Sequence, residues 1–193
     1  ILVQMPVPKH IEEKKVILAI RPEKDVDCFH PYNVGRMVIG EPVFLPCTPA
    51  GVMRLLDEYG VDPEGKTCVV VGRSSIVGKP LAMLMVQRNA TVMLSHTHTQ
   101  HLKAKCRQAD ILVTAAGQVG LITGDMIREG AVVVDVGINR NEKGELCGDV
   151  DYAAVEPIVK AADKLSAYIK CVEEQKAGNT EFDSAARQTM DAM

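Results

Sequence analysis

Residues 69–80 read VVVGRSSIVGKP, an apolar run that leads into a polar turn bounded by Gly72 and Gly78. A strand, a glycine-rich turn and a following helix are the arrangement in which backbone N–H groups and the helix N-terminus bind a phosphate. Only the first and last glycines of the G-x-G-x-x-G pattern are present, so a purely structural tight turn is the alternative. We expect a nucleotide phosphate site at this turn.

Downstream of the turn, apolar runs alternate with helical stretches. We expect strands at 67–71, 91–94, 111–115 and 131–136, helices at 80–88 and 100–108, and a helical turn at 125–128. The strand runs are apolar throughout, as expected of parallel strands that are covered on both faces. The predicted fold class is therefore α/β, a Rossmann-type doubly wound parallel sheet with right-handed crossovers.

Upstream of the turn the pattern is less regular. Residues 1–5 (ILVQM) predict a buried strand, residues 10–20 a helix, and residues 24–40 irregular chain. Thr48 and Pro49 predict a helix start, a hydroxyl N-cap followed by proline at the first helical position, with the helix running to about Tyr59.

These patterns divide the chain into three parts. We expect residues 1–45 to be the remnant of a second, partial α/β domain and residues 46–151 to be the nucleotide-binding domain. Residues 152–193 are expected to form a C-terminal helical segment, with a helix from Tyr152 to about Lys164 and a divergent, polar and alanine-rich tail after Ile169.

The composition is that of a packed globular protein: 193 residues, 47% hydrophobic and 24% charged, with a formal net charge of -3. This charge gives no general attraction for nucleic acid or an acidic membrane, and no apolar run approaches the roughly 18 residues of a membrane span. None of the six cysteines forms a C-x-x-C pair, so we interpret them as reduced thiols in a cytoplasmic protein.

The end of the second expected strand favours NADP over NAD. NAD-specific folds place an acidic residue there to bind the ribose 2′-hydroxyl, whereas residues 95–99 read SHTHT, without a carboxylate. The Arg73 guanidinium and the nearby hydroxyls suit a 2′-phosphate instead. A metal site at His96, His98 and His101 is the less favoured alternative, because no nearby cysteine or carboxylate completes it.

Six blocks of sequence together resemble the bifunctional methylenetetrahydrofolate dehydrogenase/methenyltetrahydrofolate cyclohydrolase family. They appear in the family's order over roughly residues 1–169: ILVQMPVP (1–8), PEKDVDCFHPYNVG (22–35), PCTPAG (46–51), VGRSSIVGKP (71–80), GAVVVDVGIN (130–139) and GDVDY (148–152).

The resemblance implies roles for individual residues. Gln4 and Asp27 match positions on the folate side of the family's site, the amide beside a catalytic lysine and the carboxylate on the pterin ring. The alternative for Asp27 is a loop cap. The implied cofactor-binding residues are Gly72, Arg73, Ser74, Thr97, which reaches the 2′-phosphate, and Ile138, whose backbone contacts the nicotinamide amide.

The sequence also departs from the family's pattern. The family's catalytic lysine and tyrosine form a Y-x-x-x-K motif upstream of the ILVQ segment, and this motif is absent here. The family's P-V-P-G-G-V-G-P segment after the position of Ile169 is absent too, and Cys28 stands where glycine is usual. We therefore expect a truncated family member whose C-terminal end is altered.

The function implied by the resemblance is NADP-dependent oxidation of 5,10-methylenetetrahydrofolate to 5,10-methenyltetrahydrofolate, followed by hydrolysis to 10-formyltetrahydrofolate. It further implies tetrahydrofolate derivatives as substrates, a homodimer, and a place in one-carbon metabolism and purine biosynthesis. The alternative is a non-catalytic NADP-binding module or a dimerising fragment, because the catalytic lysine and tyrosine are absent.

Overall fold

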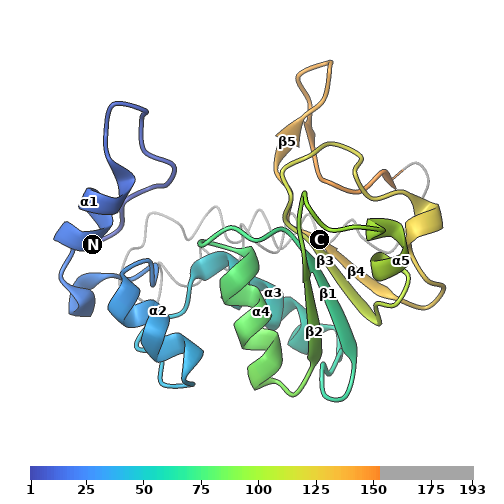
Figure 1. The fold of residues 1–193 in the computed structure, drawn as a ribbon, viewed down its shortest axis with the longest axis horizontal. Helices are drawn as coiled ribbons and strands as arrows, with labels where there is room; N and C mark the ends of the chain where they lie inside the picture. Colours follow the sequence, from blue (N-terminus) through green and yellow to red (C-terminus); the bar gives the residue numbers. More distant parts are fainter. Residues whose placement is uncertain (153–193) are drawn as a thin grey trace.

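The computed structural model describes residues 1–152 of the chain, and these residues form an α/β fold around one parallel sheet (Figure 1). The sheet contains β1 (Thr67–Val71), β2 (Thr91–Ser95), β3 (Ile111–Thr114) and β4 (Val132–Asp135) in the order β2-β1-β3-β4. All three pairings are parallel. The predicted fold class is confirmed, and the strand ends agree with the predicted ones to within one residue.

Both faces of the sheet are buried, because the side chains of a strand alternate between its two faces. Cys68 and Val70 of β1 belong to a core cluster that is shared with α3 (Cys47–Glu58) and α4 (Gly78–Gln87). Val69 and Val71 belong to a second cluster.

The second cluster lies under α5 (Leu102–Cys106) and the 3₁₀ turn η2 (Gly124–Met126), on the opposite face of the sheet from α3 and α4 (Figure 1). Because all four strands are parallel, their carboxyl ends lie at a single edge of the sheet. The order of the strands reverses between β1 and β3, and in open α/β sheets ligands bind at such a switch point.

The segment before the sheet contains α1 (Glu13–Ala19), the 3₁₀ turn η1 (Pro22–Lys24) and α2 (Pro31–Val38). The prediction of a buried strand at residues 1–5 is wrong. Ile1 and Leu2 are 58% and 48% exposed, and within residues 1–152 no strand pairs with this segment. An apolar run forms a strand only where another backbone accepts and donates its hydrogen bonds.

The prediction of irregular chain over residues 24–40 is also wrong, because α2 occupies residues 31–38. Pro31 is the first residue of this helix, where its missing N–H costs nothing. The ring of His30 caps the helix by accepting a hydrogen bond from the backbone N–H of Tyr32, at 3.2 Å. Helix α3 begins at Cys47 after Pro46, so the predicted N-cap at Thr48 is wrong by two positions.

A two-stranded antiparallel hairpin, β5 (Asn139–Arg140) and β6 (Leu146–Cys147), follows β4 and projects away from the sheet (Figure 1). The sequence did not predict it. The helix expected from Tyr152 to Lys164 lies outside the described residues, except for its first position. In the part that the structure describes, no helix is both long enough and apolar enough to cross a membrane.

Candidate functional site

The glycine-rich turn between β1 and α4 brings backbone segments into direct contact. Gly72 has φ +131°, and a Cβ added to it would lie 2.2 Å from the carbonyl oxygen of Ala115 in the loop after β3. A Cβ on Gly78 would lie 2.0 Å from the carbonyl oxygen of Gly72. Neither position has room for a side chain, so the turn folds tightly enough for a ligand to approach its backbone.

Ser74 organises the start of α4. Its hydroxyl oxygen accepts hydrogen bonds from the backbone N–H groups of Val77, at 3.1 Å, and Gly78, at 3.3 Å. A hydroxyl that accepts in this way still has its own proton to donate, and Ser74 is exposed. The turn therefore presents a hydroxyl donor at the N-terminus of a helix, which favours an anion.

The end of β2 lies next to this turn. The backbone N–H of Gly72 donates to the carbonyl oxygen of Ser95, at 2.9 Å. Desolvation lowers the pKa of the half-buried His96, and the positive charge of Arg73 lowers it further, together with His98. Arg73 and Thr97 are both exposed here, so the edge carries a guanidinium, a hydroxyl and imidazoles that a phosphate could bind.

The histidines at this edge are held by local contacts. His96 and His98 pack edge to face with ring centroids 6.0 Å apart, and the Nδ1 atom of His96 accepts a hydrogen bond from the backbone N–H of His98. Within residues 1–152 no group of three or more histidine, cysteine or acidic side chains is placed to hold a metal ion.

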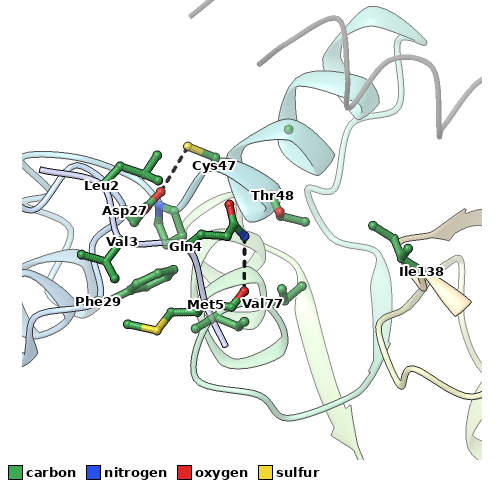
Figure 2. Close-up of a pocket in the computed structure, with 13 residues that line it drawn as sticks. Leu2, Val3, Gln4, Met5, Asp27, Phe29, Cys47, Thr48, Val77 and Ile138 are labelled. Atoms are coloured by element: carbon green, nitrogen blue, oxygen red, sulfur yellow. Dashed lines mark hydrogen bonds between the residues drawn. The ribbon is translucent and has the colours of Figure 1, made fainter. Parts of the chain in front are cut away.

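A cavity of about 310 Å³ lies between the N-terminal segment and the sheet domain (Figure 2). Three of the site residues that the family resemblance implies line this cavity, namely Gln4, Asp27 and Ile138. The remaining lining residues are mostly apolar: Leu2, Val3, Met5, Phe29, Pro46, Cys47, Thr48, Gly51, Ile76 and Val77.

The carboxylate and the amide of the cavity, Asp27 and Gln4, lie on the side of the N-terminal segment. The Sγ atom of Cys47 donates a hydrogen bond to Oδ1 of Asp27 at 3.7 Å, and the Gln4 amide donates to the carbonyl oxygen of Met5 at 3.2 Å (Figure 2). Ile138 lies across the cavity, after β4 (Figure 2). Since Ile76 and Val77 of the glycine-rich turn line the same cavity, the cavity and the turn adjoin.

Asp27 owes its position to a neighbouring carboxylate, Asp25, which the sequence did not single out. Asp25 is buried and accepts hydrogen bonds from the backbone N–H groups of Phe29 and His30 and from the side chain of Asn33. These bonds close the turn on which Asp27 lies. Cys28 in the same turn has φ 59°, a conformation that glycine adopts without strain, and its side chain is buried in the core.

Three cysteines are unsuited to act as nucleophiles. Burial raises the pKa of the Cys28 and Cys106 thiols to about 11 and that of Cys68 to about 12. A thiol with such a pKa stays protonated at neutral pH, and the thiolate is the reactive form. These residues act as small apolar side chains of the core.

Two buried carboxylates at the carboxyl ends of β3 and β4 were also missed. Asp135 is 4% exposed and Asp149 is fully buried. Asp149 follows Gly148 and Asp135 lies two residues before Gly137, but the sequence alone gives no sign that two acidic side chains point inward.

The comparisons with known proteins agree with this geometry. The family model described as tetrahydrofolate dehydrogenase/cyclohydrolase, NAD(P)-binding domain, matches residues 46–165. A second model, described as 5′-deoxynucleotidase YfbR-like, matches residues 144–193, less than half of the chain.

Among curated proteins, the bifunctional protein FolD of Streptococcus pneumoniae serotype 4 is 58% identical over 158 residues, which is 82% of this chain and 55% of that protein. FolD of Ruminiclostridium cellulolyticum is 55% identical over 86% of this chain and 58% of its own length. The chain thus spans a little over half the length of these relatives.

Solved structures give the same result. The bifunctional enzyme FolD, methylenetetrahydrofolate dehydrogenase/cyclohydrolase, from Campylobacter jejuni is 49% identical with a TM-score of 0.76, over 79% of this chain and 54% of that one. The Trypanosoma brucei enzyme, solved with NADP cofactor and an inhibitor, is 40% identical with a TM-score of 0.76, over 82% and 57%. The chain belongs to the tetrahydrofolate dehydrogenase/cyclohydrolase family, and the match to its NAD(P)-binding domain covers residues 46–165.

Proposed function

We propose that the chain binds NADP at the glycine-rich turn and a tetrahydrofolate derivative in the adjoining cavity. The reaction is the oxidation of 5,10-methylenetetrahydrofolate to 5,10-methenyltetrahydrofolate, followed by hydrolysis to 10-formyltetrahydrofolate. The observation that carries the proposal is the cavity itself, because it joins Gln4 and Asp27 to Ile138 and to two residues of the turn.

The turn fits a dinucleotide on structural grounds. Gly72 and Gly78 leave its backbone open to close approach, since a Cβ on either would overlap a backbone oxygen. Ser74 has a hydroxyl proton available at the start of α4. These groups would bind the pyrophosphate at the carboxyl end of β1, which lies at the switch point of the sheet.

Arg73 and Thr97 would bind the 2′-phosphate that distinguishes NADP from NAD. A guanidinium binds phosphate oxygens with two parallel hydrogen bonds, and Thr97 adds a hydroxyl. Desolvation lowers the pKa of His96, and the positive charge of Arg73 beside the ring lowers it further. A bound phosphate would offset that charge. The backbone of Ile138 would hold the nicotinamide amide at the far side of the cavity.

The folate would lie between Asp27 and Ile138. A pterin ring carries N–H donors along one edge, and a carboxylate is an acceptor that can pair with two of them. Gln4 adds an amide on the same side of the cavity. Bound NADP accepts a hydride at C4 of its nicotinamide, so the contribution of these residues to oxidation is to position the folate carbon against it.

The hydrolysis step needs a group that activates water and moves a proton. The described residues that line the cavity offer a carboxylate, an amide, a thiol and a hydroxyl, but no lysine or histidine. This observation favours a second candidate function for this chain, a non-catalytic NADP-binding module or dimerising fragment.

We further propose that the protein acts as a cytoplasmic homodimer in one-carbon metabolism and purine biosynthesis, as the family resemblance implies. Residues 1–45 are proposed as part of the folate-binding domain and residues 46–151 as the NADP-binding domain. The C-terminal segment expected at residues 152–193 lies outside the described residues, apart from Tyr152. Sedimentation of the purified chain tests the dimer, since a monomer at micromolar concentration would contradict it.

Calorimetric titration tests the binding function. We expect NADP to bind more tightly than NAD, because NAD leaves Arg73 and Thr97 without their phosphate. Tetrahydrofolate should bind the wild-type chain and bind Asp27→Asn more weakly. Equal affinities for the two dinucleotides would remove the 2′-phosphate assignment, and equal tetrahydrofolate affinities would remove the role of Asp27.

A further inference from the structure

Asp149 occupies the centre of a hydrogen-bond cluster at the edge of the proposed cofactor site. Its Oδ2 atom accepts from the backbone N–H groups of Ala116, at 2.6 Å, and Gly117, at 3.2 Å. Its Oδ1 atom accepts from the backbone N–H of Gln118, at 2.8 Å, and from the side-chain amide of Asn139, at 2.9 Å. One buried carboxylate thus binds four donors from two separate loops.

Asp135 holds Asp149 in turn. Its Oδ1 atom accepts from the backbone N–H groups of Gly137, at 2.9 Å, and Asp149, at 3.1 Å, and its Oδ2 atom accepts from Val150 at 2.8 Å. The hydroxyl of Thr114 donates to Oδ1 at 3.0 Å. Within residues 1–152 neither side chain forms an ion pair, so hydrogen bonds alone hold the oxygen atoms of Asp135 and Asp149.

The two loops that Asp149 joins are walls of the site. The loop after β3 begins at Ala115, whose carbonyl oxygen lies against Gly72 of the cofactor turn. The loop after β4 carries Ile138, which lines the folate cavity. Asp149 therefore connects the wall next to the pyrophosphate turn with the wall next to the nicotinamide.

Packing does not fix the position of Ile138, because its side chain is 81% exposed. Hydrogen bonds hold the residues on either side of it, Gly137 and Asn139. The N–H of Gly137 is bound by Asp135, and a Cβ on Gly137 would lie 2.4 Å from Cγ of Asp149. The side chain of Asn139 is bound by Asp149. The backbone of Ile138 is thereby fixed on both sides by the two carboxylates.

We infer that Asp149 is a positioning residue for the nicotinamide end of the cofactor, acting through the loops at 116–118 and 137–139. This inference rests on the proposed binding of NADP. The role needs two acceptor oxygens, because an asparagine at this position would turn an N–H₂ group toward backbone N–H donors and leave some of them unpaired.

The test compares NADP with 2′,5′-ADP, which contains the adenine end and the 2′-phosphate but no nicotinamide. Asp149→Asn should weaken NADP by roughly tenfold or more and change the affinity for 2′,5′-ADP by less than about twofold. Asn139→Ala leaves both carboxylates in place and should weaken NADP in the same selective way. If Asp149→Asn fails to fold, the affinities of Asn139→Ala for the two ligands decide the test.

Asp110→Asn is the matched control. Asp110 accepts a hydrogen bond from the backbone N–H of Thr67 at the opposite end of β1, so its loss should lower thermal stability without changing either affinity. Equal weakening of both ligands by Asn139→Ala and Asp149→Asn, or unchanged NADP binding in both, would overturn the inference.

A failure of the proposed function gives a different result, because the wild-type chain would then bind neither ligand. Hydrogen exchange decides the positioning role in that case. The amides of residues 116–118 should exchange faster in Asp149→Asn than in the wild type, while those of β1 should not. Unchanged exchange at 116–118 would show that Asp149 does not hold this loop.

Discussion

Arg73 is the residue on which the dinucleotide preference depends. It is exposed on the cofactor turn, and within the described residues no carboxylate pairs with it. The positive charge of Arg73 nevertheless acts on its surroundings, since it adds to the effect of desolvation in lowering the pKa of His96. An unpaired guanidinium beside hydroxyls and imidazoles is suited to a ligand that brings its own negative charge.

Arg73→Ala should weaken NADP binding by about 1.5–3 kcal/mol, the range for hydrogen bonds to charged groups. Binding of NAD should change little, because NAD has no phosphate at this position. Titration calorimetry with both dinucleotides measures the difference. Arg54→Ala, on the exposed face of α3, controls for the loss of one positive charge. If both dinucleotides weaken equally, Arg73 supports the structure of the turn and does not select NADP.

Gly72 allows the cofactor turn to pack against the loop after β3, because it has no side chain. Gly72→Ala should destabilise the chain by about 2–4 kcal/mol and abolish NADP binding, because the added Cβ would overlap the carbonyl oxygen of Ala115. Gly144→Ala is the matched control, since Gly144 has φ +80° but no atom within 4 Å of the added Cβ. Thermal unfolding should show a much smaller loss for Gly144→Ala. Equal losses would assign the effect to backbone conformation alone.

At the scale of elements, the strands were the most predictable part of the chain. Each is a short, continuously apolar run between polar turns, and such runs are typical of parallel strands buried on both faces. The helix α2 was missed because Pro31 and Gly35 suggested a loop, while the capping ring of His30 is visible only in three dimensions. The strand expected at residues 1–5 failed because pairing depends on a neighbouring strand, which an apolar pattern does not reveal.

Asp110 links the start of β1 to the loop after η2, and the stability that it contributes should depend on pH. The N–H of Thr67 and the Arg128 side chain both donate to it, and they hold the pKa of this carboxyl below its usual 3.8. A carboxyl with a lowered pKa stabilises the fold above pH 3.8, and that stabilisation is lost as pH falls through the pKa of the folded state.

Asp110→Asn should therefore lower the free energy of unfolding at pH 6 by about 0.5–1.5 kcal/mol, and the difference from wild type should narrow below pH 3.8. Urea unfolding at both pH values measures it. Asp125→Asn is a useful comparison. Hydrogen bonds from the side chains of Lys103 and Thr123 also lower the pKa of Asp125, but neither of these two bonds reaches the backbone of a strand. A difference that persists unchanged in acid would show that the charge of Asp110 contributes nothing.

At the scale of the whole molecule, the candidate site combines residues that are distant in the sequence. The family resemblance singled out Gln4, Asp27 and Ile138, and all three line one cavity. The carboxylates that organise the site, Asp25 and Asp149, could not be predicted in this way, because their role depends on backbone N–H groups that converge only after folding. Sequence patterns reveal ligand-binding side chains more readily than the groups that position them.

Turnover by this chain depends on how its cavity holds the folate and on which groups can transfer a proton. Folate oxidation requires the two ligands to be held in contact, and the hydrolysis that follows also requires a group that transfers a proton. Among the described residues that line the cavity, none is an amine or an imidazole, and the one carboxylate, Asp27, is proposed to bind the pterin ring. We expect negligible dehydrogenase and cyclohydrolase activity from a chain that still folds and binds NADP.

The measurement follows the absorbance of methenyltetrahydrofolate with purified chain, methylenetetrahydrofolate and NADP. Loss of a general acid–base group typically costs about 10²–10⁴-fold in rate, and a loosely held folate lowers the rate further. NADP binding, measured on the same preparation, shows that the protein is folded. Turnover on the order of 1–10³ per second would contradict the prediction and show that this chain holds both ligands in a reactive arrangement.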